Sequence, residues 1–122
     1  MMDAGREPYI ALATFRKDGR EVRTPVWIAA GEGRVWVYTN LNTGKVKRVR
    51  NNGRARVAPS DIRGKPRGDW VDAKARLIED PEARDRAIQV FVDKYGGQMK
   101  LALLASRLSG RYKQRGIIEL EF

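Results

Sequence analysis

Val35-Trp36-Val37-Tyr38-Thr39-Asn40-Leu41-Asn42-Thr43-Gly44-Lys45-Val46-Lys47-Arg48-Val49-Arg50 is a stretch that predicts a strand running directly into a short helix. Its first part is β-branched and aromatic, which is typical of a strand. The run Asn42-Thr43-Gly44 is a helix-start signal, with Thr43 at the N-cap position. Val46 and Val49 lie three residues apart and give the helix one apolar side. The dipeptide Asn52-Gly53 ends this helix, and residues 54–58 are predicted to form the next strand.

The charge around this helix is one-sided. Residues 33–60 contain no Asp or Glu, although the segment carries seven basic residues and the whole chain has a formal charge of +10. A helix N-terminus presents free N–H groups and the positive end of a dipole, so a lysine in the first turn is unfavourable by itself. A phosphate bound to these amides and neutralised by Lys45 and Lys47 would explain the pattern. A solvated basic helix is the alternative that a run of charge leaves open.

Length and composition limit the kinds of protein that the chain can be. Its 122 residues suit one domain, 1–122, and contain no apolar run near the roughly 20 residues of a membrane span. We therefore expect no membrane partner. The chain has no cysteine and shows no secretory signal, so a cytoplasmic location is expected.

The missing residue types also limit the chemistry. Without His or Cys, the common zinc sites and the Ser-His and Cys-His catalytic pairs cannot form. We expect no metal site and no catalytic side chain, so that a bound cofactor would supply the reactive atom of an enzyme. The positive charge favours an anionic partner: nucleic acid, an anionic membrane surface or a polyanionic small molecule.

The remaining segments predict a mainly β protein. Strands are expected at residues 8–15, 21–30, 70–78 and 117–122, with a tight Asp18-Gly19 turn between the first two. Helices are expected from Asp80-Pro81 to Gly96 and at 98–108. Pro25 cannot donate to a strand ladder and requires an edge, a bulge or an open site. Six strands with tight turns favour a small antiparallel barrel, because closure hides the strand edges.

Several of these stretches together resemble a known family. Arg23-Thr24-Pro25-Val26-Trp27-Ile28, Val37-Tyr38-Thr39-Asn40 and Thr43-Gly44-Lys45 resemble the flavin-binding pattern of the pyridoxamine 5'-phosphate oxidase-like split barrels. With Thr14-Phe15-Arg16-Lys17-Asp18-Gly19-Arg20 and Ala73-Lys74-Ala75-Arg76-Leu77, the chain is similar to the branch of probable coenzyme F-420 (deazaflavin) enzymes. The resemblance implies a six-stranded antiparallel split β-barrel of the FMN-binding type. It also implies a homodimer with the cofactor in a groove between subunits.

The resemblance assigns cofactor-binding roles residue by residue. Arg23 matches a basic position before the strand that runs beneath the cofactor's ring system, and Lys45 matches the phosphate-binding lysine. Tyr38 and Thr39 match residues beside the ring and the cofactor's phosphoryl side chain. The backbone along the ring is matched by Thr24, Pro25, Val26 and Trp27. The chain departs from the oxidase pattern at Gly44, where a second phosphate-binding arginine is expected. Lys47 or Arg48 would have to replace it. The oxidase's C-terminal Arg/His substrate segment is absent, so pyridoxamine phosphate is not the expected substrate.

Three functional hypotheses remain. The first is an oxidoreductase that transfers hydride to or from a small organic substrate with coenzyme F-420, or alternatively FMN. F-420 is preferred because its oligoglutamate tail would use the surplus basic charge. The second is a cofactor-binding or carrier protein without catalysis. The third is a basic nucleic-acid-binding barrel, which is disfavoured because no aromatic residues alternate with the basic ones in the helix.

Overall fold

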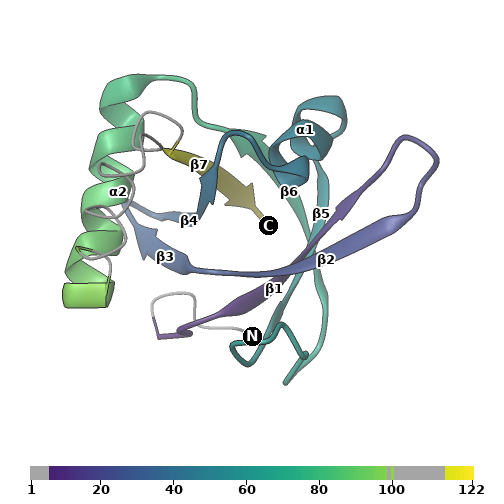
Figure 1. The fold of residues 1–122 in the computed structure, drawn as a ribbon, viewed down its shortest axis with the longest axis horizontal. Helices are drawn as coiled ribbons and strands as arrows, with labels where there is room; N and C mark the ends of the chain where they lie inside the picture. Colours follow the sequence, from purple (N-terminus) through teal and green to yellow (C-terminus); the bar gives the residue numbers. More distant parts are fainter. Residues whose placement is uncertain (1–5, 99, 101–114) are drawn as a thin grey trace.

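Seven antiparallel strands form one sheet in the order β2-β1-β5-β6-β7-β4-β3, and the sheet curls into a half-open barrel (Figure 1). The computed structural model describes residues 6–98, 100 and 115–122. The elements in chain order are β1 (Ile10–Phe15), β2 (Glu21–Val26), β3 (Ile28–Gly31), β4 (Arg34–Asn40), α1 (Gly44–Asn51), β5 (Arg54–Pro59), β6 (Val71–Leu77), α2 (Pro81–Tyr95) and β7 (Arg115–Glu121).

The prediction of one strand over residues 21–30 is wrong, because the chain divides at Trp27 into β2 and β3. The two halves pair with different neighbours: β2 with β1 at one end of the sheet, and β3 with β4 at the other. One straight strand cannot pair at both ends of the sheet. The segment therefore bends, and this bend lets the sheet curl into a barrel. Beside the bend, the Tyr38 N–H donates to the Trp27 carbonyl at 3.3 Å. The sheet thus has seven strands instead of six, and Pro25 lies on the edge strand β2.

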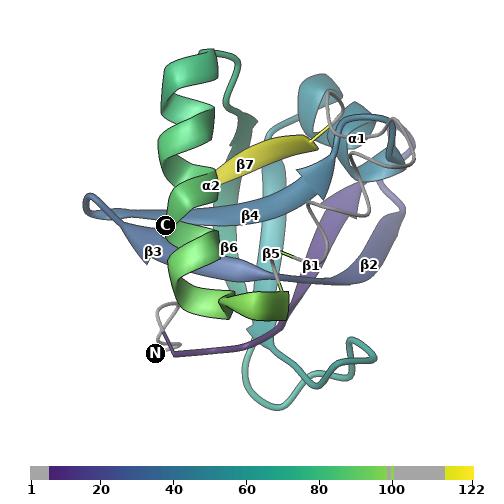
Figure 2. The ribbon, with the colours of Figure 1, turned by 60° about the vertical axis from the view of Figure 1, so that its left-hand side comes forward.

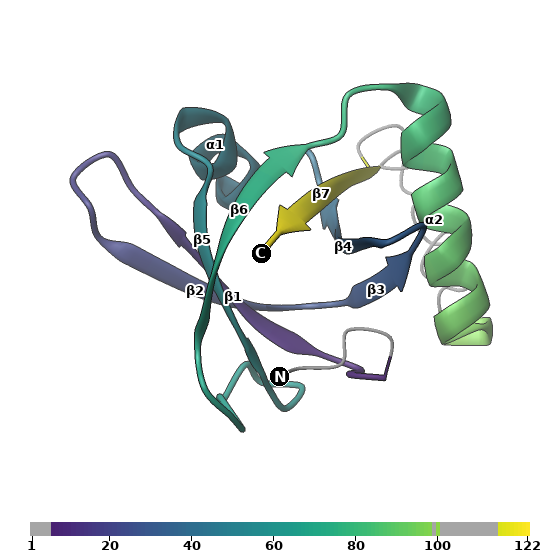
Figure 3. The same cartoon turned by 180° about the vertical axis from the view of Figure 1, so that it is seen from behind.

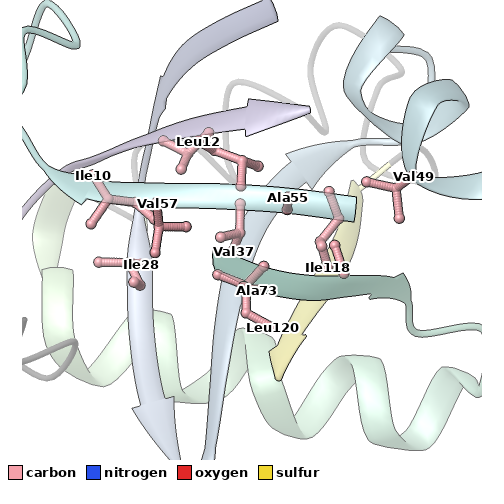
Figure 4. Packing of buried hydrophobic residues seen from close by; sticks show 12 residues of the cluster. Ile10, Leu12, Ile28, Val37, Val49, Ala55, Val57, Ala73, Ile118 and Leu120 are labelled. Atoms are coloured by element: carbon pink, nitrogen blue, oxygen red, sulfur yellow. The ribbon is translucent and has the colours of Figure 1, made fainter. Parts of the chain in front are cut away.

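The barrel interior holds the main hydrophobic core, to which all seven strands and α1 contribute (Figure 4). Alternate residues point inward, as the two-residue period of a strand requires. The core residues are Ile10, Leu12, Val26, Ile28, Val37, Val49, Ala55, Val57, Ala73, Ala75, Ile118 and Leu120.

A second core lies between the outer face of the sheet and α2, which crosses β3, β4 and β7 (Figure 2). Phe91 is its largest fully buried member, and Trp36 is only 2% exposed. Ile117 faces this second core, whereas the next residue, Ile118, faces the barrel interior. This explains why the last strand, predicted at 117–122 and found at 115–121, carries Ile117 on a face whose other residues are charged. Figure 3 shows β7 beside β6, its partner in the sheet.

Both predicted helix starts are confirmed, although their caps differ. The Asp80 side chain accepts from the Ala83 N–H at 3.3 Å and caps α2, with Pro81 in the first turn. Thr43 occupies the N-cap position of α1, but its hydroxyl donates to the Asn40 carbonyl at 2.9 Å and makes no capping bond. The first turn of α1 is therefore left without a side-chain cap. Most of the helix predicted at 98–108 lies outside the described residues.

Candidate functional site

The start of α1 gathers basic side chains at one end of the barrel. A surface cavity of about 370 Å³ lies between α1 and the β1–β2 hairpin. Its lining contains no acidic residue and consists of Arg16, Lys17, Gly44, Lys47, Arg48 and Asn51. The free amides of the uncapped first turn and these cations are suited to an anion, since both favour negative charge.

Lys45, the predicted phosphate-binding residue, is half-buried in the first turn of α1. Burial first, and then the nearby charge of Arg48, lower the pKa of its ammonium group. Among the described residues no carboxylate pairs with it. A partly desolvated cation without a counter-ion is unfavourable, and a bound phosphate would relieve that cost. The residues present thus fit a phosphorylated ligand at this place.

The predicted residues of β2 lie elsewhere on the barrel wall. The Arg23 guanidinium lies 4.6 Å from the centre of the Trp70 ring and 3.0 Å from a carboxylate oxygen of Glu21. Pro25 is exposed, whereas the side chain of Val26 belongs to the core and leaves only its backbone for a ligand. The Thr24 hydroxyl is buried without a hydrogen-bond partner among the described residues.

The predicted aromatic residues lie under α2. The Trp27 ring stacks on Tyr95, with ring centres 4.8 Å apart, and is 6.3 Å from the ring of Tyr38. Thr39 is only 3% exposed and lies 3.4 Å, hydroxyl to hydroxyl, from Thr43 at the start of α1. Trp27 and Tyr38 therefore already have packing partners within the protein, and Thr39 connects β4 to the helix start.

The structure thus divides the nine predicted residues among three places: the start of α1, the wall at β2, and the layer under α2. Lys45, Lys47 and Thr39 lie at or next to the first place. Of these three, only Lys47 lines the cavity, whose lining also includes Arg16, Lys17 and Asn51, to which the sequence assigned no cofactor-binding role. The hairpin residues come close to α1 only through tertiary structure. No local pattern in the sequence predicts this contact.

A second polar cluster lies on the opposite wall and was not predicted. Glu119 accepts hydrogen bonds from Arg34 at 3.0 Å, from the Trp36 indole at 3.2 Å and from Arg76 Nε at 2.9 Å. Burial opposes ionisation, but the bonds from Arg34, Arg76 and Trp36 outweigh it, and the pKa of Glu119 lies below its usual value. With its acceptors satisfied, Glu119 connects β4, β6 and β7.

Metal-type ligands do not gather within the part of the chain that the structure describes: no group of three Asp, Glu, His or Cys residues is close enough to hold an ion. Over the same residues, no helix is both long enough and apolar enough to span a membrane.

The model of the family described as pyridoxamine 5'-phosphate oxidase matches residues 4–122, almost the whole chain. The chain belongs to this family. The match agrees with the curled antiparallel sheet and with the resemblance found in the sequence. Among the curated proteins, none matches the chain.

Several solved structures share this fold. A conserved hypothetical protein of Mycobacterium tuberculosis has a TM-score of 0.68 and 21% identity, covering 94% of this chain and 72% of that one. The heme storage protein HutZ of Vibrio cholerae has a TM-score of 0.69 and 13% identity, covering 95% and 82%. An F420 reductase has a TM-score of 0.61 and 16% identity, covering 97% and 88%. At these identities the similarity establishes the split-barrel fold alone.

Proposed function

We propose that the protein is an oxidoreductase that binds coenzyme F-420, or alternatively FMN, through its phosphate at the start of α1. The observation that carries the proposal is Lys45: half-buried, with a lowered pKa, and with no carboxylate partner among the described residues. Membership of the family and the similarity to an F420 reductase support a flavin-type cofactor. The chain has no histidine, an axial ligand of iron in many haem proteins, so we favour this class over haem.

The protein's own part in the reaction would be binding and positioning. Lys45 and the amides of α1 would hold the phosphate, while the backbone of β2 around Thr24 and Pro25 would lie along the ring. A bound deazaflavin or flavin supplies or accepts a hydride, and one proton exchanged with water completes the two-electron change in a small organic substrate. We assign no side chain to bond breaking.

We also propose that two copies of the chain form the cofactor groove, as the resemblance implies. Val71, the first residue of β6, and Phe122, which directly follows β7, are 36% and 57% exposed although both are apolar. Such surface favours contact with a second copy. Sedimentation of the purified protein at twice its 13.9 kDa mass would support this assembly, and a monomer at micromolar concentration would oppose it.

Parallel titrations with coenzyme F-420 and FMN, followed by cofactor fluorescence, test the proposed function. We expect Lys45→Ala to weaken binding of the phosphorylated cofactor roughly 10- to 150-fold, or about 1.5–3 kcal/mol, the range of a charged hydrogen bond. Arg50→Ala is a matched control, because Arg50 lies on the same helix, is exposed and points toward Glu79 at 3.9 Å. An unchanged dissociation constant for Lys45→Ala would contradict the assignment of the phosphate site to Lys45.

Two further measurements separate the alternatives. A carrier protein would bind the cofactor but show no substrate-dependent change at the cofactor's absorbance band, whereas an enzyme would show it. A nucleic-acid-binding barrel would bind oligonucleotides with steep salt dependence and would bind neither cofactor.

A further inference from the structure

The C-terminal end of α2 binds the backbone of the bend between β2 and β3. The Trp27 carbonyl accepts from Tyr38 on β4, so the N–H and C=O of the next residue, Ile28, point away from β4. Because β3 is the last strand of the sheet, no further strand of the described chain pairs with these two groups. Two side chains of α2 take that place. The Tyr95 hydroxyl accepts from the Ile28 N–H at 3.1 Å, and Lys94 Nζ donates to the Ile28 carbonyl at 2.5 Å.

Tyr95 also fixes the side chain at the bend. Its ring stacks on Trp27, with ring centres 4.8 Å apart and planes 15° apart. Phe91, one turn earlier in α2 and fully buried, lies nearly parallel to the Tyr95 ring at 6.0 Å. The Trp27 ring is thus connected through Tyr95 to the second core. One end of one helix therefore holds both the backbone and the side chain of the bend.

The same two residues bind the segment that precedes β1. Lys94 Nζ donates to the Glu7 carbonyl at 2.6 Å. The Tyr95 hydroxyl donates to the carbonyl of Pro8 at 2.8 Å or of Ile28 at 3.0 Å. Both side chains are half-buried, so these bonds are partly shielded from water. A hydrogen bond has a preferred direction, whereas apolar packing has none. The two residues thus fix the orientation of the peptide groups at the bend, which the apolar stripe of α2 alone would not do.

We infer that Tyr95 and Lys94 are positioning residues for the ring of the cofactor. The inference rests on the proposed function, in which the ring lies along the β2 backbone at Thr24 and Pro25, next to the bend. Groups that bind a ligand must be held within about 0.5 Å of their productive places. Tyr95 and Lys94 meet this need at the ring end of the ligand, because they hold the bend. The phosphate end is held at α1, so the two ends of the ligand depend on different helices.

Ligands with and without phosphate separate the two ends. The probes are FMN with riboflavin, or coenzyme F-420 with its phosphate-free deazaflavin riboside, according to which cofactor binds. Tyr95→Phe removes the hydroxyl, and Lys94→Met keeps the stem but removes the ammonium group. We expect each variant to weaken binding of both ligands by the same factor, at least about threefold, which is the effect of one lost hydrogen bond. Lys45→Ala, in contrast, should weaken binding of the phosphorylated ligand only.

Ile88→Val is the matched control for loss of stability. Ile88 lies on α2, is only 4% exposed and has no polar atom that could bind the bend. The smaller side chain should lower the melting temperature but change both dissociation constants less than about twofold. At saturating ligand, the absorbance band of the bound cofactor should shift in Tyr95→Phe and stay in place in Ile88→Val. The position of the band depends on the surroundings of the ring and not on the fraction of folded protein.

The outcomes also separate this inference from the proposed function. Weakening below this threshold by Tyr95→Phe, or by Lys94→Met if the first variant does not fold, would overturn the inference. Equal effects of Ile88→Val and Tyr95→Phe would do the same, because both would then act through stability alone. If the wild-type protein binds a cofactor and Lys45→Ala weakens it while both polar variants of α2 bind as wild type does, only the positioning role is wrong. If the wild-type protein binds neither cofactor, both proposals are wrong.

Discussion

The charge of Lys45 favours the proposed ligand binding but lowers the stability of the cofactor-free protein. Its pKa is lowered by burial and by Arg48, so the folded state disfavours the charged form. Lys45→Met keeps the apolar stem and removes the charge. We expect the cofactor-free variant to be more stable at pH 7 by about 0.5–1 kcal/mol, a modest gain because solvent screens a half-exposed group. Urea denaturation of both proteins measures this difference.

The sign of the pH dependence follows from the direction of this shift. Between the lowered pKa and the ordinary value of 10.5, the unfolded chain holds the proton more tightly, so the stability of the wild-type protein rises with pH. The advantage of Lys45→Met should therefore shrink over this window and vanish above it. An advantage that is absent at pH 7, or that grows with pH, would contradict the account.

At the residue scale, the sequence predicted the helix start well and its surroundings poorly. Lys45 lies in the first turn of α1 as expected, because the Asn-Thr-Gly signal is local. Thr43 occupies the N-cap position as predicted, but its hydroxyl bonds to Asn40 and does not cap the helix. The hydrogen bond between Arg48 and Thr14 joins residues 34 positions apart, and no local pattern predicts such a pair.

The phenol of Tyr95 adds hydrogen bonds to the hydrophobic packing that holds α2 on the sheet. The Tyr95 hydroxyl accepts from the Ile28 N–H at 3.1 Å and donates to the carbonyl of Pro8 at 2.8 Å or of Ile28 at 3.0 Å. Tyr95→Phe would leave the Ile28 N–H without this acceptor, and we expect a loss of about 1–3 kcal/mol in unfolding free energy. Urea denaturation at pH 7 measures it, and a loss under 0.5 kcal/mol would contradict the role.

The same phenol should make stability fall at high pH. Burial raises the pKa of Tyr95 from 10.0 to about 12. Because the folded pKa is the higher one, the contribution is complete below pH 10 and is lost as pH rises through about 12. Tyr95→Phe lacks this group, so the difference in stability between the two proteins should narrow between pH 10 and 12.

At the element scale, elements with strong local signals were predicted within a few residues. The Asp-Pro start and Gly96 end of α2 and the Asp-Gly hairpin are all found. The division at Trp27 was missed, because inward and outward residues alternate through the bend without interruption. Val26 and Ile28 both enter the same core, so the pattern of burial contains no sign of the change in pairing. Only the closure of the sheet requires it.

The whole molecule is a curled sheet whose curl follows from that bend. The antiparallel barrel class could be predicted, since several strands linked by tight turns favour closure, which hides the strand edges. The strand order could not, because it depends on long-range pairs such as β4 with β7. This strand order also brings the β1–β2 hairpin and α1 to the same cavity.

The charge of the whole molecule gives a test of which cofactor it takes. The chain carries a formal +10, and the cavity beside α1 is lined by cations. Both cofactors offer a phosphate, but only coenzyme F-420 adds an anionic tail that reaches beyond it. Screening shortens the range of charge interactions from about 10 Å at 0.1 M salt to about 3 Å at 1 M. We therefore expect F-420 to lose roughly tenfold more affinity than FMN over this range. Fluorescence titrations at both salt concentrations measure the two losses, and equal losses would show that the basic surface does not engage the tail.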